Sequence, residues 1–347
     1  MKLFVTGGAG FIGSQFIRFM LRKNRDTQIV NFDKLTYAGN LDNLKECEGN
    51  PRYAFVRGDI ANAAQVRKAL SGGGFDAIVN FAAETHVDRS IGSPSDFLNT
   101  DIFGTFCLLE AVREFGIPRY IQISTDEVYG TVPVGSCTET APLNPSNPYS
   151  ASKAGGDLLA FSYFRTYRTP VLITRASNNY GPNQYPEKFI PLATTNALDN
   201  RPIPLYGDGM QIRDWLFVED HCRAIQTVLM KGKEGEIYNI GGDQERPNRE
   251  IAEMILALLD KPNELVRHVA DRPGHDTRYS LDCSKLKKLG WQPTIPVEEG
   301  IRRTVEWYRD NRWWWEKIKS GEFKQYYQEH YGHRLDESTT PDKEDEQ

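Results

Sequence analysis

Six short apolar runs in the first half of the chain alternate with longer amphipathic stretches. The runs are rich in Val, Ile and aromatic residues and show little polar alternation: KLFVTG, QIVNFD, YAFVRGD, AIVNFAA, RYIQIST and VLITRAS. Strands that are buried on both faces have this composition. Because the intervening segments are long enough for crossover helices, the pattern predicts an α/β fold with a doubly wound parallel sheet.

The pattern changes after residue 177. NNYGPNQYPEKFIPL and RPIPLYGDGMQIRDW are dense in Pro, Gly and Asn, and we interpret them as ordered loops interleaved with helices near 186–199, 219–231 and 248–259. We therefore expect one domain over 1–177 and a smaller, mixed domain over 178–332, from which EIYNIGG (236–242) could return to the sheet.

The C-terminal part of the chain combines many aromatic residues with a polar end. The aromatic residues of 301–331 predict core or interface packing rather than a membrane or base-stacking role. Residues 333–347 are polar and charged and predict a disordered tail.

Composition narrows the function classes. The 347 residues are 39% hydrophobic and 26% charged, as in soluble globular proteins, and the net charge of −5 gives no reason to expect nucleic acid. The apolar runs are strand-sized and no leader precedes the first one, so we expect no membrane span. Five scattered cysteines predict reduced thiols in a cytoplasm. His330 and His333 lack an acidic or cysteine partner, so no metal site is predicted.

A glycine-rich turn follows the first strand. Gly7, Gly10 and Gly13 open the helical stretch FIGSQFIRFMLRK, and such glycines let backbone N–H groups approach a pyrophosphate. The second strand ends at Asp33, twenty residues past Gly13, where a carboxylate accepts hydrogen bonds from a ribose diol and repels a 2′-phosphate. Asp59 and Ile60 close the third strand, where an adenine edge would lie. This spacing predicts a Rossmann-type domain that binds NAD rather than NADP.

Tyr149 and Lys153 in NPYSASK stand four residues apart at the start of a predicted helix, so they share one face. A nearby ammonium group favours the phenolate, and we expect the pKa of Tyr149 to lie below its ordinary value. A tyrosinate can take the proton of an alcohol while hydride leaves for nicotinamide.

STDEVYG places Thr125, Asp126 and Glu127 side by side at the end of an apolar run. Adjacent acids repel one another, and burial penalises their ionisation. A solvated loop would tolerate them, and so would chemistry that needs both an acid and a base. Because consecutive strand side chains face opposite ways, the second reading requires a turn or bulge at Asp126–Glu127.

These motifs together resemble the extended short-chain dehydrogenase/reductase family, whose members act on nucleotide sugars; the likeness runs from VTGGAGFIGS to DRPGHDTRY. TDE is the pattern of one group in that family, the dTDP-glucose 4,6-dehydratases. The resemblance implies that Thr125, Tyr149 and Lys153 oxidise C4 of dTDP-glucose with NAD. It further implies that Glu127 removes the C5 proton, that Asp126 protonates the departing C6 hydroxyl, and that hydride returns to C6.

The resemblance also assigns binding residues. Cofactor contacts are expected from Gly7, Gly10, Phe11, Ile12, Gly13, Asp33, Lys34, Leu35, Thr36, Asp59, Ile60, Phe81, Ala82, Ala83, Thr85, Thr100, Tyr149, Lys153 and Asn179. Substrate contacts are expected from Thr85, Thr125, Asn178, Lys188, Leu192, Pro204, Tyr206, Arg213, Asn248, Arg272 and His275. The family more often has Leu and Ser where this chain has Phe81 and Thr85.

Proteins with the same fold but other functions are alternative interpretations of these residues. A UDP-sugar 4-epimerase or a UDP-glucuronate decarboxylase needs Tyr149, Lys153 and NAD but leaves Asp126 idle. A GDP-mannose 4,6-dehydratase usually has Ser at the place of Asp126 and usually takes NADP, which Asp33 disfavours. A silent NAD-binding scaffold would typically have lost Tyr149 or Lys153. Relatives dimerise through two helices per subunit, so we expect a homodimer through helices near 95–115 and 150–168.

Overall fold

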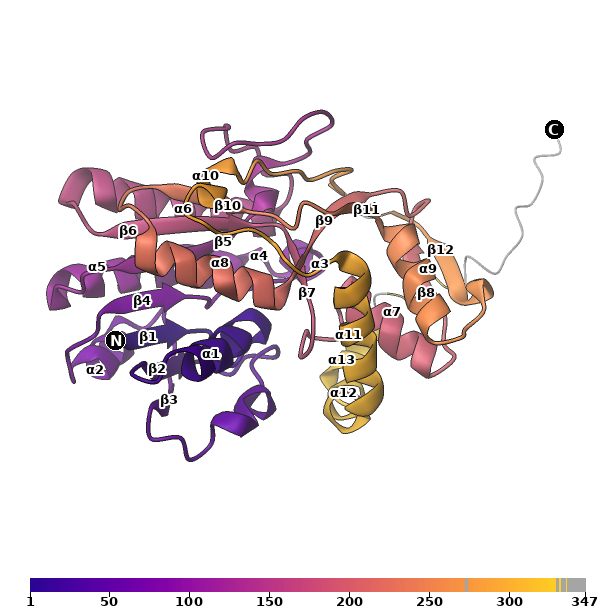
Figure 1. The fold of residues 1–347 in the computed structure, drawn as a ribbon, viewed down its shortest axis with the longest axis horizontal. Helices are drawn as coiled ribbons and strands as arrows, with labels where there is room; N and C mark the ends of the chain where they lie inside the picture. The colour runs from indigo at the N-terminus through magenta and orange to yellow at the C-terminus, as the bar shows by residue number, and fades with distance from the viewer. Residues whose placement is uncertain (272–273, 329–330, 332–334, 336–347) are drawn as a thin grey trace.

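The computed structural model describes residues 1–271, 274–328, 331 and 335. Its larger lobe holds a seven-stranded sheet in the order β10-β6-β5-β4-β1-β2-β3 (Figure 1). Every neighbouring pair in this sheet is parallel. The strands are β1 (Lys2–Thr6), β2 (Gln28–Asp33), β3 (Tyr53–Arg57), β4 (Ala77–Asn80), β5 (Tyr120–Thr125), β6 (Val171–Ala176) and β10 (Ile237–Ile240). The six predicted strands and the return of 236–242 to the sheet are confirmed.

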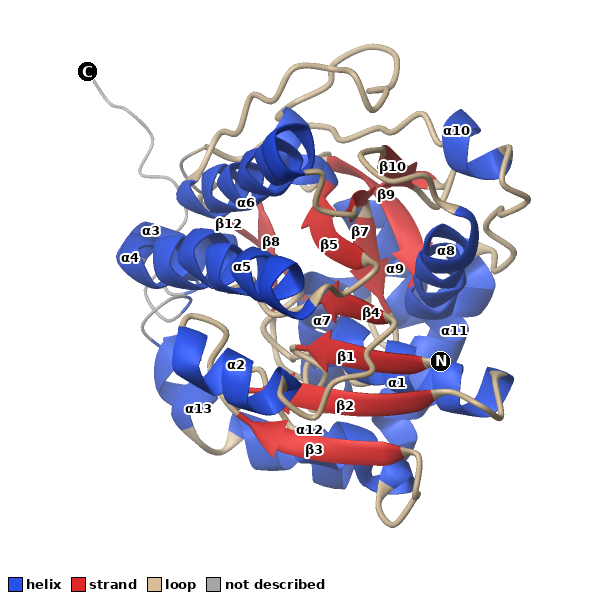
Figure 2. Cartoon of the chain, turned by 90° about the vertical axis from the view of Figure 1, so that its left-hand side faces the viewer, coloured by secondary structure: helices blue, strands red, loops and turns tan. Residues whose placement is uncertain are grey.

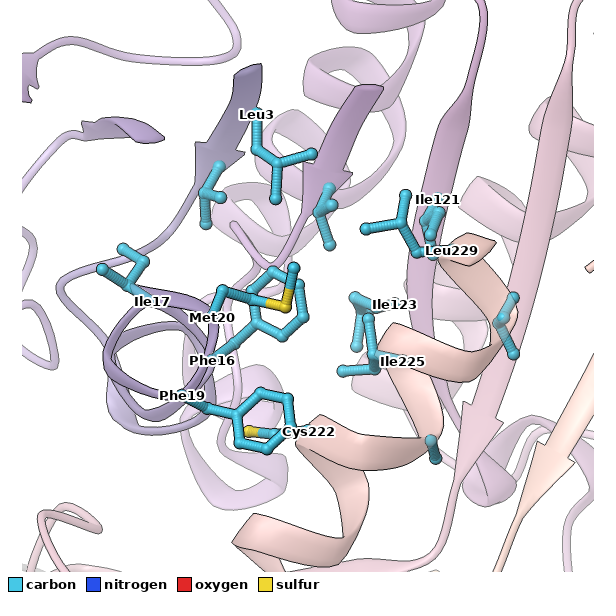
Figure 3. Packing of buried hydrophobic residues seen from close by; sticks show 14 of the residues in the cluster. Leu3, Phe16, Ile17, Phe19, Met20, Ile121, Ile123, Cys222, Ile225 and Leu229 are labelled. Carbon is cyan, nitrogen blue, oxygen red and sulfur yellow. The ribbon is translucent and has the colours of Figure 1, made fainter. Parts of the chain in front are cut away.

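Helices cover both faces of this sheet (Figure 2). On one face lie α1 (Phe11–Lys23) and α8 (Val218–Lys231), and on the other α2 (Ala63–Leu70), α5 (Thr105–Phe115) and α6 (Pro148–Tyr167). Successive strand residues alternate between the two cores: Leu3 and Val5 pack with α1 and α8, and Phe4 packs on the opposite side. Figure 3 shows the first core, where Phe16 and Met20 of α1 face Ile225 of α8.

Short helical segments lie in the connections between the longer elements of both lobes. They are η1 (Leu41–Cys47), α3 (Val87–Gly92), α4 (Pro94–Phe97), η2 (Leu98–Gly104), η3 (Asp126–Tyr129), η4 (Asn263–Leu265) and α10 (Ser284–Lys287). The segment η2 is π-helical and runs directly into α5.

The smaller lobe combines short strands with helices. Its strands are β7 (Asn178–Tyr180), β9 (Ile212–Phe217) and β11 (Glu245–Pro247) in one sheet, and β8 (Ile203–Tyr206) paired with β12 (Val266–Val269) in another. Its helices are α7 (Phe189–Leu198), α9 (Asn248–Leu258), α11 (Val297–Asp310), α12 (Arg312–Lys319) and α13 (Glu322–Tyr327). A separate apolar cluster between α7, α9, α11 and β9 forms its core.

Of two predictions for the second half of the chain, one is wrong and the other is confirmed. RPIPLYGDGMQIRDW is not only loop, because it contains β8 and most of β9; that interpretation is wrong. The aromatic residues of the C-terminal helices pack as predicted, with Tyr308, Trp314 and Trp315 almost fully buried in one cluster. The predicted tail over 333–347 falls almost entirely outside the described residues, as do His330 and His333.

In the described part of the chain, no helix is both long and apolar enough to cross a membrane. The same residues contain no group of three or more His, Cys, Asp or Glu side chains placed to hold a metal ion.

Candidate active site

A cavity opens where β1, β2, β4, β5 and β6 end. Its walls come from the loops after these strands and from the first turn of α6. The carboxyl ends of parallel strands are where α/β sheets bind their ligands. The segments that carry the candidate motifs therefore meet at one cavity, although Gly7 and Lys188 are 181 positions apart in the sequence.

The glycine turn between β1 and α1 allows a close approach of backbone. Gly7 has φ of +65°, and a Cβ there would lie 2.5 Å from the Ala82 nitrogen. A Cβ on Gly13 would lie 2.4 Å from the Gly7 carbonyl oxygen. Side chains at either position would fill the space between strand, turn and helix, so the glycines create a cradle for a ligand at the N-terminus of α1.

Asp33 ends β2 and faces the cavity. Its two oxygens accept backbone N–H groups, from Ala9 at 2.9 Å and from Leu35 at 2.7 Å. Burial raises the pKa of Asp33, while these two hydrogen bonds oppose the rise. Each carboxylate oxygen can accept a further hydrogen bond, so the fixed side chain suits a ribose diol. The glycine cradle and Asp33 together fit NAD.

Thr125, Asp126 and Glu127 lie at the end of β5, where the chain turns into η3. The Thr125 hydroxyl accepts the Glu127 N–H at 3.2 Å and donates to Asp126 Oδ1 at 3.2 Å. The turn predicted at Asp126–Glu127 is thus present as a 3-10 helix capped by Thr125. All three residues line the cavity, so the solvated-loop reading of these acids is wrong.

Asp126 is 2% exposed. Burial raises the pKa of its carboxyl group well above the ordinary value, and the neighbouring charge of Glu127 raises it further. Arg213 and the Thr125 hydroxyl act in the opposite direction but do not outweigh burial. A raised pKa favours the protonated form of Asp126, which is the form that a general acid needs.

Tyr149 and Lys153 lie in the first turns of α6, whose N-terminus Asn147 and Ser150 cap reciprocally. Phe97 packs edge-on against the Tyr149 ring with centroids 6.2 Å apart, and Lys153 Nζ donates to the Ile123 carbonyl at 2.8 Å. Both residues line the cavity beside Thr125. The helix thus presents a phenol and an ammonium group to the same space.

The expected lowering of the pKa of Tyr149 is wrong for this ligand-free structure. Burial raises it well above the ordinary phenol value, and the charges of Glu127 and Asp101 add to the rise. A hydrogen bond with Thr125 lowers it but is the smaller effect. The sequence indicated the cation four residues away and grouped Glu127 with Tyr149, but it did not indicate Asp101, whose charge also acts on the ring.

Most of the predicted cofactor residues reach the cavity. Besides those already described, its walls include Gly10, Phe11, Ile12, Lys34, Thr36, Asp59, Ile60, Phe81, Ala82, Ala83, Thr85, Thr100 and Asn179. Lys34 and Asp59 form an ion pair of 2.8 Å. Leu35 does not line the cavity; it contributes its backbone N–H to Asp33 instead.

Four predicted substrate residues, Thr85, Thr125, Asn178 and Lys188, line the cavity. Lys188 Nζ donates to the Thr85 carbonyl. Leu192, Pro204, Tyr206, Arg213, Asn248 and His275 lie outside its walls. Arg272 falls outside the described residues.

Some of the predicted substrate residues that lie outside the cavity wall contact one another. The rings of Tyr206 and His275 are 5.8 Å apart, and the Tyr206 hydroxyl donates to Asp88 Oδ2 at 3.3 Å. Arg213 is 4% exposed, stacks over Tyr279 and donates to the Asp276 carbonyl at 2.9 Å. Leu192 packs in the cluster that contains Tyr206.

The wall residues that were not predicted include Glu84, Gln184, Tyr185 and His221. Glu84 could have been found, because it follows β4 at the edge where ligands bind. His221 is fully buried in α8 and contacts Asn179 Oδ1 through Nδ1 at 2.9 Å. Nothing local marks a histidine in an amphipathic helix as part of a site.

Comparison with known proteins agrees with this geometry. The family model described as GDP-mannose 4,6 dehydratase matches residues 4–304. A dTDP-glucose 4,6-dehydratase from Streptomyces niveus is 53% identical over 325 residues, which cover 92% of this chain and 96% of that protein.

Two solved structures share the fold. A double mutant of the dTDP-glucose 4,6-dehydratase from Streptomyces venezuelae, with NAD and DAU bound, matches with a TM-score of 0.90 and 51% identity, covering 92% of this chain and all of that one. The Bacillus anthracis dTDP-glucose 4,6-dehydratase in complex with NAD matches with a TM-score of 0.86 and 47% identity over the same shares.

The Rossmann-type sheet, the glycine cradle and the tyrosine–lysine pair define a dinucleotide-dependent enzyme of the extended short-chain dehydrogenase/reductase class. Within that class the chain belongs to the GDP-mannose 4,6-dehydratase family, and the three relatives described above are all dTDP-glucose 4,6-dehydratases.

Proposed function

We propose that this chain converts dTDP-glucose to dTDP-4-keto-6-deoxyglucose and water. The observation that carries the proposal is the pair Asp126 and Glu127, which η3 presents to the same cavity as Tyr149 and Lys153. Oxidation and reduction alone need only the tyrosine and lysine. A buried, protonated carboxyl group beside a second carboxyl group is what an elimination of water adds to that requirement.

The first step is the oxidation of C4. Tyr149 takes the C4 hydroxyl proton, Thr125 hydrogen-bonds the C4 oxygen, and Lys153 supplies positive charge beside them. Bound NAD supplies the acceptor for the C4 hydride and later the donor to C6. The residues placed to hold NAD are the glycine turn, Asp33 and the segment Phe81–Thr85, all in the cavity wall.

The second step is the elimination. A C4 ketone makes the C5 proton acidic, because the carbanion that forms is an enolate. Glu127 removes that proton, and Asp126 gives its own proton to the C6 hydroxyl, which leaves as water. Hydride then adds to C6 and a proton to C5, so that no cofactor is consumed. One neutral and one ionised carboxyl group is also the state that their mutual repulsion favours.

Substrate binding would use cationic and aromatic side chains. Lys188 and Arg213 suit the diphosphate, because a cation neutralises its charge. We assign the nucleobase end to Tyr206 and His275, whose rings are in contact, together with Pro204 and Asn248. Lys188 lines the cavity and donates to the Thr85 carbonyl, which supports its assignment.

The proposal is tested by incubating the purified protein with dTDP-glucose and no added reductant. We expect a product lighter by one water, detected by mass spectrometry, and no accumulation of free reduced cofactor. UDP-glucose and UDP-glucuronate are run in parallel. If dTDP-glucose stays unchanged while a UDP-sugar is epimerised or decarboxylated, the dehydratase assignment is wrong and Asp126 needs another role.

The molecule is further proposed to act as a homodimer. Four apolar side chains on η2, α5 and α6 are strongly exposed: Leu98 at 53%, Phe103 at 48%, Phe106 at 38% and Leu158 at 60%. The Phe103 and Phe106 rings stack on each other with centroids 5.7 Å apart. An apolar face of this kind on two adjacent helices suits a four-helix contact between two copies.

The division into two domains and the cellular location of the protein are also proposed. We place the boundary between the NAD-binding and nucleotide-sugar-binding domains at residues 177–178, with β10 contributed to the first sheet by the second part of the chain. All five cysteines are free thiols, which supports a reducing cytoplasm.

A further inference from the structure

The π-helical segment η2 carries a buried carboxylate that the proposed mechanism does not use. Residues Leu98–Gly104 form this segment between α4 and α5. π-helical turns inside α-helices are rare and occur frequently at functional sites. Here the segment places Thr100 in the cavity wall and buries Asp101, which is 2% exposed.

The two oxygens of Asp101 join two parts of the cavity wall. Oδ1 accepts the backbone N–H of Glu84 at 3.1 Å, and Oδ2 accepts the hydroxyl of Ser152 at 2.6 Å. Glu84 directly follows Phe81–Ala83, the segment expected to face the nicotinamide. Ser152 lies between Tyr149 and Lys153 on α6, and its hydroxyl also contacts the Tyr149 carbonyl at 2.8 Å.

Two glycines let α6 approach close enough for this link. A Cβ on Gly156 would lie 2.8 Å from the Asp101 carbonyl oxygen, and a Cβ on Gly155 would lie 2.6 Å from Ile102. The pair GG in the middle of a helix costs stability relative to alanine. The close contact with η2 accounts for it.

The electrostatic surroundings of Asp101 come from several elements. Burial raises its pKa to about 6, and Lys153 of α6, the Ser152 hydroxyl and the Glu84 amide act in the opposite direction. Burial also raises the pKa of the Glu84 carboxyl group to about 7, with Asp101 and Asp96 adding to the rise and Lys34 and Arg89 opposing it.

The charge of Asp101 also reaches the catalytic helix. It is one of the charges that raise the pKa of Tyr149, after burial and Glu127. Asp126 of η3 has the same effect and is the smallest of these causes. A substitution at Asp101 should therefore affect both the position of the cofactor-facing segment Phe81–Glu84 and the pKa of Tyr149.

We propose that Asp101 is a positioning residue that ties the cofactor-facing segment Phe81–Glu84 to the catalytic turn Tyr149–Lys153. Ionised Asp101 accepts one hydrogen bond from each side and so fixes the distance between the nicotinamide wall and the phenol. Its charge is also one of the causes that raise the pKa of Tyr149, after burial and the charge of Glu127. The inference rests on the proposed use of NAD but not on the identity of the sugar nucleotide.

The test uses three variants and two readouts that need no sugar substrate. NAD retention is measured on the purified protein after extensive desalting, and the ionisation of Tyr149 is followed by ultraviolet difference absorbance after subtraction of the Tyr149→Phe variant. Asp101→Ala removes both hydrogen bonds, Ser152→Ala removes the one to α6, and Asp101→Asn keeps the shape but removes the charge. Asp26→Asn, an exposed carboxylate between α1 and β2 and outside the cavity wall, is the matched control.

We expect NAD retention at least tenfold weaker in Asp101→Ala and weaker in Ser152→Ala, because bonds to a charged acceptor are lost. Asp101→Asn should retain NAD but shift the Tyr149 titration to lower pH. The control should match the parent chain. Ser152→Ala keeps the test open if Asp101→Ala does not fold. Unchanged NAD retention in every folded variant that lacks a link, or an unmoved titration in Asp101→Asn, would overturn the proposal.

Discussion

At the scale of single residues, the two adjacent acids of STDEVYG have different environments. Asp126 is buried at the start of η3, whereas Glu127 is half-buried and lines the cavity. Burial, followed by the charge of Glu127, raises the pKa of Asp126 and favours its protonated form. The two adjacent carboxyl groups could thus provide the proton donor and the base that the proposed mechanism needs.

Removing the base should separate oxidation from elimination. In Glu127→Gln the amide cannot take the C5 proton, so dehydration should fall by roughly 10²–10⁴-fold. The oxidation step remains, and reduced cofactor should accumulate on the enzyme, visible by its absorbance after mixing with dTDP-glucose. Glu306→Gln, an exposed glutamate on α11, serves as the control. Equal loss of both steps would argue against the assignment of Glu127 as base.

The pKa of Asp126 has a consequence for stability. Because it is raised in the folded chain, the folded state holds this proton over a pH range in which the unfolded chain releases it, so the contribution to stability is complete below about pH 4 and is lost as the pH rises toward the folded pKa. Asp126→Asn has no such loss. We expect the variant to gain stability over the parent between pH 4 and 8, measured by urea unfolding. A difference that shrinks with pH would contradict the burial argument.

At the scale of elements, the strands of the main sheet were predictable and those of the smaller lobe were not. The main strands are apolar on both faces, because helices cover both sides, and this composition is visible locally. In contrast, β8 pairs with β12 about sixty residues later in the chain. Its Pro and Gly neighbours resemble those of a loop, and the partner that makes it a strand cannot be inferred locally.

The candidate site divides in the same way. Residues within a motif, such as Gly7, Asp33, Thr125 and Tyr149, were predicted because spacing along the chain fixes their geometry. The effect of Asp101 on Tyr149 was not, since it depends on the contact between η2 and α6. Spacing along the sequence predicts which side chains a single helix or strand presents together. The pKa of a side chain also depends on which other elements pack against it.

The cap of η3 should matter for both folding and turnover. Thr125→Val keeps the volume but loses the hydroxyl that accepts the Glu127 N–H, so we expect a loss of about 1 kcal/mol in the free energy of unfolding. Turnover of dTDP-glucose should fall more steeply, because the hydroxyl also serves the C4 oxygen. Thr125→Ser restores the hydroxyl and should recover most of both, measured by urea unfolding and a product assay. If valine and serine behave alike, the hydroxyl has no such role.

The turn between β1 and α1 is equally specific. Gly7→Ala would place a Cβ 2.5 Å from the Ala82 nitrogen on a backbone with positive φ. We expect a loss of stability of roughly 1–3 kcal/mol and weakened NAD retention, measured by thermal unfolding and by cofactor content after desalting. Gly72→Ala, in an open turn with nothing within 4 Å, is the control. Normal cofactor retention in Gly7→Ala would contradict the proposed cradle.

At the scale of the whole molecule, residues of both lobes line the cavity. The first sheet supplies the cofactor side, and segments after β6, such as Asn178 and Lys188, complete the wall. The return of β10 to the main sheet fixes the smaller lobe to the larger one. The residues proposed for proton transfer and two of those proposed for substrate binding, Asn178 and Lys188, thus meet at one edge of the sheet.

The exposed apolar face predicts self-association. Phe103→Glu would place a charge on the stacked pair Phe103–Phe106. By light scattering coupled to size-exclusion chromatography, we expect a dimer for the parent and a monomer for this variant. Val134→Glu, at 89% exposure in a different loop, should remain dimeric. A parent chain that is monomeric at micromolar concentration would rule out the dimer.

The most direct test of the proposed function follows the hydride itself. dTDP-glucose with deuterium at C4 is incubated with the purified protein, and the product is analysed by mass spectrometry and NMR. The proposed mechanism predicts a 4-keto-6-deoxy sugar that has lost one water and carries the deuterium at C6. Deuterium that is lost to solvent, or that stays at C4 of an epimerised or unchanged sugar, would contradict the internal transfer from C4 to C6 and with it the roles given to Asp126 and Glu127.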